Sequence, residues 1–158
     1  MKERKTWKEK LADSKDLPKI LEIPDRLKAK WGSGNFVIPA PAEVDELMRQ
    51  VPKGKLTTIN HVRMALAKKH HTTTTCPLTT GIFAWIAANA AEEGSAKNEK
   101  GRLTPYWRTL KTGGLLNEKY PGGAAAQKKR LLAEGHKVRK NGKNHLVADL
   151  EQSLFDFK

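Results

Sequence analysis

The sequence is poor in cysteine, in long apolar runs and in acidic residues. Cys76 is its only cysteine, which excludes an internal disulfide and fits a reducing compartment. No apolar run approaches the roughly 18 residues needed to cross a bilayer. The charged residues 1–5 are not followed by the hydrophobic segment of a secretion signal. We therefore expect a cytoplasmic protein that does not associate with a membrane.

Metal ligands are also scarce. One candidate set is His70, His71 and Cys76, but adjacent histidines on a helix diverge, and no second cysteine or acidic ligand stands at metal spacing. We expect neither a metal nor a cofactor. A helix dipole can activate a thiol at the start of a helix, so Cys76 remains an alternative nucleophile, although a cysteine without a chemical role is the simpler interpretation.

Positive charge, in contrast, is abundant. Thirty Lys and Arg residues against seventeen Asp and Glu residues give a formal net charge of +13, and such a field attracts polyanions, above all nucleic acids. The excess is concentrated in residues 53–71, which contain no acid, and in residues 127–145, where seven cations accompany Glu134 alone. The two blocks suggest two sets of phosphate contacts; the alternative is a charge that serves only solubility.

Length and composition favour one domain with appended ends. The first forty residues are polar and interrupted by three prolines, so residues 1–40 are expected to form an arm. Trp7 and Leu11, at helical spacing, are anchors that can pack this arm onto the main domain. We expect the main domain at residues 41–136, a basic hairpin and tail at residues 137–158, and a monomer.

Three helices with short links are expected at the start of the main domain. An apolar stripe predicts a first helix over residues 41–51, which a Pro-Lys-Gly-Lys turn ends. Thr57 and Thr58 are candidate caps for a second helix that stops at the polar tract 70–75, and Pro77 opens a third helix through Ala90. This arrangement predicts a helix-turn-helix.

The chain beyond the third helix predicts a loop, a helix and a hairpin. Residues 94–102 are small and polar and indicate an exposed loop. A fourth helix fits residues 123–134, with Leu131 and Leu132 facing inward. The Asn-Gly pair at residues 141–142 is a hairpin signal. The fold class is therefore α+β and mostly helical.

Trp85 and residues 128–130 can each be interpreted either as purely structural or as part of a contact with nucleic acid. Trp85 stands among Ile82, Phe83 and Ile86, and we interpret it as a core residue rather than a stacking platform. The cationic run 128–130 is most simply the solvated face of an amphipathic helix, with phosphate contact as the second interpretation.

Three motifs follow one another in the second half of the chain: the strip 103–108 (Leu-Thr-Pro-Tyr-Trp-Arg), the turn 120–123 (Tyr-Pro-Gly-Gly) and the helix end 131–135 (Leu-Leu-Ala-Glu-Gly). Together with the three preceding helices, this order resembles the alkylguanine-DNA alkyltransferases over residues 41–136. The resemblance implies a winged helix-turn-helix of the alkyltransferase C-terminal type, with a small C-terminal hairpin.

The reactive residues of that family are replaced here. Tyr106 stands at the position of the alkyl-accepting cysteine, and Trp107 at that of the histidine that helps to form the thiolate. A phenol with its ordinary pKa of about 10 is a poor acceptor of an unactivated alkyl group, and an indole is not a base. The pattern resembles the alkyltransferase-like proteins, which bind alkylated DNA without repairing it and hand the lesion to another repair system. We therefore expect no enzymatic activity.

The resemblance also implies that the helix-turn-helix docks in the minor groove and that a target base is swung out into an aromatic pocket. The ring of Tyr106 either lines this pocket or fills it as a core aromatic. Arg108 holds the pocket loop together or is a surface cation, and Glu134 caps a helix or pairs with Arg108. The expected pocket residues are Pro105, Tyr106, Trp107, Arg108, Tyr120, Pro121, Gly122 and Gly123.

The resemblance places the DNA contacts on the turn after the first helix, on the start of the second helix and on the third helix. In the family, the second helix usually begins with a tyrosine that pushes on a phosphate, and the third carries an arginine that fills the vacated stack. Ile59 and Thr79 stand at these places, and neither supplies the cationic part of the task. The expected contact residues are Lys53, Lys55, Thr58, Ile59, Asn60, Arg63, Thr79 and Thr80.

Our leading hypothesis is a non-catalytic DNA-binding protein that recognises alkylated guanine, with double-stranded DNA and a repair protein as its partners. The first alternative is a general winged-helix DNA-binding protein without lesion specificity. The second is an active alkyltransferase that uses an unconventional acceptor, for which Cys76 is the candidate.

Overall fold

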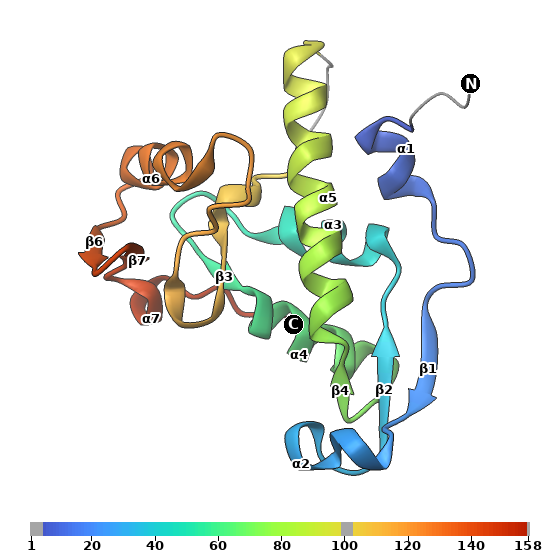
Figure 1. Ribbon diagram of the computed structural model, residues 1–158. Helices are drawn as coiled ribbons and strands as arrows, with labels where there is room; N and C mark the ends of the chain where they lie inside the picture. The colour runs from blue at the N-terminus through green and yellow to red at the C-terminus, as the bar shows by residue number, and fades with distance from the viewer. Residues whose placement is uncertain (1–4, 99–102, 158) are drawn as a thin grey trace.

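The longest helix, α5 (Pro77–Ala96), runs through the middle of the molecule, and the other elements surround it (Figure 1). The computed structural model describes residues 5–98 and 103–157, and the fold is α+β and mostly helical. Of the helices in these two ranges, none is long and apolar enough to cross a membrane.

Short elements make up the rest of the chain. The other helices are α1 (Trp7–Ala12), α2 (Lys28–Trp31), α3 (Pro41–Gln50), α4 (Ile59–His70), α6 (Gly123–Ala133) and α7 (Leu150–Ser153). The 3-10 turns are η1 (Asp25–Leu27), η2 (Tyr106–Arg108) and η3 (Thr112–Gly114). The strands are β1 (Lys19–Glu22), β2 (Asn35–Ile38), β3 (Thr57–Thr58), β4 (Thr74–Thr75), β5 (Thr109–Leu110), β6 (Val138–Asn141) and β7 (Asn144–Val147).

Local signals set the starts of α3, α4 and α5. α3 and α5 each begin with a proline at the first helical position, where the missing N–H would have no partner in any case. The Thr58 hydroxyl accepts the backbone N–H of His61 at 3.3 Å and so caps α4. All three helices lie where the sequence predicts them, but α5 extends through Gly94 to Ala96. The prediction of a loop was therefore wrong at residues 94–96, and residues 99–102 lie outside the described ranges.

Alanines on one face of α5 form the centre of the main core. Ala84, Ala87, Ala88 and Ala91 are buried, and small side chains allow α3 and α4 to pack closely against this face. The other buried members of this core cluster are Val44, Met48, Val62, Leu66, Tyr106 and Tyr120.

The first forty residues are joined to the helices through a small sheet. β2 pairs with β1 in antiparallel register and with β4 in parallel register, so the sheet order is β1-β2-β4 (Figure 1). Val37 of β2 is fully buried. α1 lies beside α5, where Glu93 accepts the backbone N–H groups of Trp7 and Lys8 at 3.1 and 3.3 Å. The arm is thus attached to the helices in two places, through the sheet and through α1.

A second apolar cluster lies under the C-terminal elements. It contains Leu56, Leu110, Leu116, Leu131 and Val147, and the parallel pair β3 and β5 crosses it. Leu131 of α6 is buried here, but the prediction that Leu132 also faces inward was wrong. Leu132 is 49% exposed, because α6 presents only one face to the cluster.

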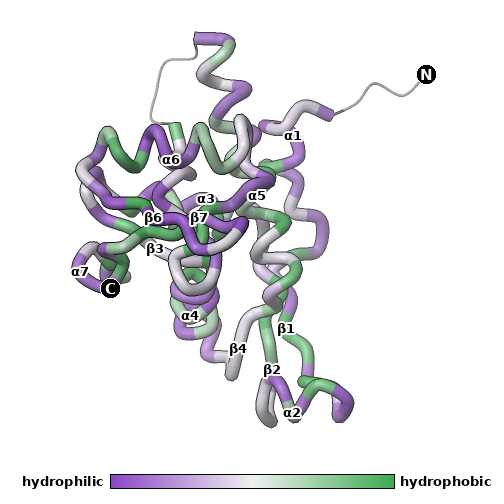
Figure 2. Tube along the Cα trace, turned by 60° about the vertical axis from the view of Figure 1, so that its left-hand side comes forward, coloured by the Kyte–Doolittle hydropathy of each residue, from purple (hydrophilic) through white to green (hydrophobic). Residues whose placement is uncertain are grey.

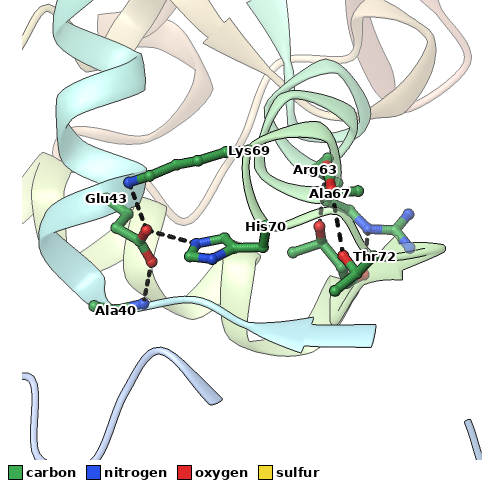
Figure 3. A network of polar contacts seen from close by, with 8 residues as sticks. Ala40, Glu43, Arg63, Ala67, Lys69, His70 and Thr72 are labelled. Atoms are coloured by element: carbon green, nitrogen blue, oxygen red, sulfur yellow. Dashed lines mark hydrogen bonds and ion pairs between the residues drawn. The ribbon is translucent and has the colours of Figure 1, made fainter. Parts of the chain in front are cut away.

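A polar network fastens α3 to the end of α4 (Figure 3). Glu43, with its side chain 12% exposed, accepts hydrogen bonds from Lys69 and His70 at 2.7 Å each and from the backbone N–H of Ala40 at 2.9 Å. Burial opposes ionisation of Glu43, but the bonds from Lys69, Ala40 and His70 outweigh it and lower the pKa of the carboxyl below its ordinary value.

We expect Glu43→Gln to lower the free energy of unfolding at neutral pH by about 1–2 kcal/mol. A carboxyl with a lowered folded-state pKa stabilises the protein above its unfolded pKa of about 4.3, and this contribution is lost as the pH falls through the lowered value. Denaturant unfolding from pH 7 down to about pH 3 should therefore give a shallower loss for the variant. Glu46→Gln, on an exposed residue of the same helix, is the control; parallel curves for wild type and Glu43→Gln would contradict the prediction.

Candidate nucleic-acid interface

A groove of about 650 Å³ opens between the first half of α5 and the segment 111–119. Its volume is within the range of roughly 300–1,000 Å³ that is typical of small-molecule sites. Ile59, the first residue of α4, also lines it. The residues from α5 are Pro77, Leu78, Gly81, Ile82 and Trp85, and those of the opposite wall are Lys111, Thr112, Leu115, Asn117, Glu118 and Lys119.

The α5 wall exists because this helix is apolar on two faces. Leu78, Ile82 and Trp85 are 71%, 43% and 37% exposed, and their spacing of four and three residues places them on one stripe. The prediction that Trp85 is a core residue was therefore wrong. The alanine face fills the core, so the bulky side chains of the other face are left at the surface.

The arm holds Trp85 in place. The rings of Trp7 and Trp85 meet edge to face with their centroids 4.8 Å apart, and Lys10 lies over the Trp7 ring at 4.2 Å. Because α1 is capped by Glu93 of α5, both tryptophans are fixed to the same helix. Trp85, which lines the groove, is thus supported by a residue far from it in the sequence.

The opposite wall is held by the C-terminal elements. The backbone N–H of Leu116 donates to the carbonyl of His145 of β7 at 2.9 Å, and Leu115 bridges to Leu146 in antiparallel register. The turn before it needs glycine: Gly114 has a φ of +87°, and a β-carbon at this position would lie 3.2 Å from Leu150. The wall is therefore a fixed part of the fold.

The aromatic residues expected to line a pocket pack against one another at the main core. Tyr106 is only 3% exposed, and its hydroxyl donates to Glu92 at 2.5 Å. Tyr120 is also buried; its hydroxyl donates to the carbonyl of Thr109 at 3.0 Å, and its ring lies 5.3 Å from that of Tyr106. Burial, reinforced at Tyr106 by Glu92, raises the pKa of both phenols above the ordinary value. Of the two geometries expected for Tyr106, the structure has the ring that fills its space.

Trp107 and Arg108 share one carboxylate. Glu134 accepts two hydrogen bonds from the Arg108 guanidinium, at 2.9 and 2.8 Å, and one from the Trp107 indole at 3.1 Å. Arg108 also donates to the carbonyl of Val51 at 2.8 Å. Burial opposes ionisation of Glu134, but Arg108 and Trp107 outweigh it and lower the pKa of the carboxyl. Arg108 is thus a link between the strip, α3 and α6 rather than a surface cation.

The other residues of the expected pocket belong to turns. Pro105 is buried before η2, and Pro121 precedes α6. Gly122 has a φ of +80° as the N-cap of α6, and a β-carbon there would meet that of Ala126 at 2.6 Å. Gly123 then begins the helix. None of the eight expected pocket residues lines the groove.

The expected DNA contacts fall into three groups. Lys53 and Lys55 are exposed in the turn before β3, and Ile59 lines the groove. Thr58 and Thr80 are buried, so the prediction that they contact DNA was wrong: their hydroxyls bond within the protein, to His61 and to the Cys76 carbonyl.

The third group contains Asn60, Arg63 and Thr79. Arg63 donates to the Thr75 carbonyl, to Asn60 and to Thr74 at 3.0, 3.0 and 3.3 Å, so its guanidinium is held against β4. Thr79 is half-buried on the first turn of α5, and its hydroxyl reaches the Cys76 carbonyl at 3.5 Å. Neither residue lines the groove.

Sequence reasoning missed most of the groove. Leu78 and the wall residues Leu115, Asn117 and Lys119 were not singled out, and Trp85 was assigned to the core. A signal was present, because the bulky residues of α5 repeat at helical spacing on the side away from its alanines. Within residues 5–98 and 103–157, no three His, Cys, Asp or Glu side chains are grouped so that they could hold a metal ion.

Comparisons with known proteins found similarity among solved structures. No protein-family model matches the chain, and no curated protein matches it. Among solved structures, the chain is similar to the alkyltransferase-like protein Atl1 of S. pombe in complex with damaged DNA containing O6-carboxymethylguanine, with a TM-score of 0.45. A structure of S. pombe ATL in complex with DNA gives a TM-score of 0.46. Both matches have 16% identity and cover 73% of this chain and 94% of the other. At this level of similarity, the function has to follow from the chain's own residues.

We expect Glu134→Gln to lower the free energy of unfolding by about 3 kcal/mol, because it leaves the largely buried guanidinium of Arg108 without its counter-charge. Denaturant unfolding at pH 7 measures the effect. Asp25→Asn, which removes the exposed partner of Lys28, should cost less than about 1 kcal/mol. Equal losses of unfolding free energy in the two variants would show that the pair of Arg108 and Glu134 stabilises the protein no more than an exposed ion pair does.

Proposed function

We propose that this protein is a non-catalytic DNA-binding protein. In this proposal α4 and α5 act as a helix-turn-helix with the β6–β7 hairpin as its wing, and the groove beside α5 receives an alkylated guanine swung out of the duplex. The observation that carries the proposal is the groove itself, which combines an apolar wall, an aromatic ring and lysines on the opposite wall.

These components suit an unstacked base on a charged backbone. Swinging a base out of a duplex costs a few kcal/mol in lost stacking. Stacking on the exposed ring of Trp85 and apolar contact with Leu78 and Ile82 can offset this cost. Lys119, on the opposite wall, is suited to an adjacent phosphate, whereas Lys111 on the same wall pairs with Glu118 at 3.6 Å.

The packing of the strip 103–108 supports the proposed absence of catalysis. Tyr106 has a raised pKa and donates a hydrogen bond to Glu92, so a phenolate is disfavoured. Trp107 cannot serve as a base, and its N–H is already used by Glu134. Residues 41–136 would be the main part of the DNA-binding unit, the hairpin in residues 137–158 would be its wing, and residues 1–40 would brace Trp85. A repair protein is the proposed second partner, since a protein that binds a lesion without removing it requires one.

A second candidate is a DNA-binding protein that does not distinguish lesions. The enclosed ring of Tyr106 favours it, as does the presence of Ile59 and Thr79 where a flipping protein would need a tyrosine and a cation. In this case the protein residues that line the groove beside α5 would contact the edge of the DNA minor groove, and no base would enter between them.

We expect a duplex with one O6-alkylguanine to bind more tightly than its unmodified counterpart at the same salt concentration, by about tenfold, the equivalent of roughly 1.4 kcal/mol. Fluorescence anisotropy measures both affinities. Equal affinities would leave the second candidate, and no binding would exclude both. Intact mass after the same incubation should be unchanged, whereas a gain of the alkyl group, on Cys76 or elsewhere, would establish transfer.

We expect Trp85→Ala to weaken binding of the modified duplex by about 1–3 kcal/mol, because the base loses its stacking surface. The unmodified duplex should lose less, so the ratio of the two affinities should fall. Trp31→Ala is the matched control, since Trp31 is the last residue of α2 and packs on Phe36 of β2. Removal of the Trp31 ring should leave the ratio of the two affinities unchanged. A ratio that survives Trp85→Ala would exclude the ring as the platform.

A further inference from the structure

The β6–β7 hairpin carries a group of cations without counter-charges. The side chains of Lys137, Arg139, Lys140 and Lys143 are exposed, and none forms an ion pair with another residue of the described ranges. Residues 135–148 contain no acid. The flanking acids are already engaged, Glu134 by Arg108 and Asp149 by His136. The fold therefore leaves these charges for a ligand outside the chain.

The hairpin is fixed to one wall of the groove. β7 is bonded to this wall through the backbone pairing of Leu115 and Leu116 with Leu146 and His145. Figure 2 shows β6 and β7 on the side of the molecule that comes forward in that view, with a hydrophilic stretch between them. The cations consequently lie on a hairpin whose second strand is bonded to the groove wall.

The hairpin carries its cations on a short two-stranded ribbon. Successive side chains of a strand point to opposite faces, so the neighbouring cations of β6 spread their charge over both faces of the hairpin. Arg139 and Lys140 lie on β6, and Lys143 lies in the tight turn, where Gly142 has a φ of +63°. Two strands joined by such a turn hold their cations at nearly fixed separations, which reduces the entropy lost on binding.

We propose that the β6–β7 hairpin binds the phosphates of the duplex that flank the base held in the groove. The hairpin then supplies affinity that is independent of the lesion, while the groove supplies discrimination. This inference rests on the proposed function, since it takes duplex DNA to be the ligand.

The test compares two charge-matched triple variants of the full chain. The first is Arg139→Gln, Lys140→Gln and Lys143→Gln. The control is Arg26→Gln, Lys28→Gln and Lys30→Gln, which removes one arginine and two lysines at α2 and the turn before it, far from the hairpin (Figure 1). Anisotropy titrations with modified and unmodified duplexes at several salt concentrations give the affinity and its salt slope. Thermal unfolding checks that both variants are folded.

We expect the hairpin variant to reduce the salt slope by about 2–3, or roughly 0.9 for each phosphate that the hairpin no longer neutralises. Its affinity for modified and unmodified duplexes should fall by the same factor, so their ratio should not change. The control should keep the wild-type slope. An unchanged slope in the hairpin variant overturns this inference while wild-type binding preserves the proposed function. An equal fall in both variants also overturns it, since only net charge would then matter. Failure of the wild type to bind any duplex overturns both.

Discussion

The buried ion pair of Arg108 and Glu134 is the constraint on which the candidate site depends. Its three hydrogen bonds, counting that of Trp107, and the bond from Arg108 to Val51 join the strip 105–108 to the ends of α6 and α3. The chain that leaves this strip forms β5, η3 and the groove wall. Because the pair is largely shielded from water, each member needs the other. The pair therefore fixes the course of the chain that leads into the groove wall.

The groove itself results from an unequal division of side-chain size around α5. Alanines allow the helix to approach α3 and α4, and the larger Leu78, Ile82 and Trp85 are left on the outer side. Exposed apolar side chains are unfavourable in water. A stripe of three such side chains on one helix is therefore typical of a surface that binds another molecule. The arm reinforces this surface, because Trp7 packs on Trp85.

Much of the fold was predictable because its signals are local. Prolines and Thr58 mark the helix starts, and the Asn-Gly pair marks the C-terminal hairpin. The candidate site was predictable only in part. The motifs suggested that Tyr106 either lines a pocket or fills it, and in the structure its ring packs between Tyr120 and Trp107, while none of the eight expected pocket residues lines the groove. Sequence motifs identify neighbours along the chain, and they do not determine which side of a packed layer faces solvent.

The sequence by itself determined the identities of Tyr106 and Trp107, the cationic excess and the order of the helices, since residue identity and local propensity are properties of the chain. Only the tertiary structure decided that Trp85 lies at the surface, that Thr58 and Thr80 are buried, and that β7 forms the support of the groove wall. These outcomes depend on how much volume each face of a helix must fill against its neighbours, and that volume is fixed only when distant segments pack together.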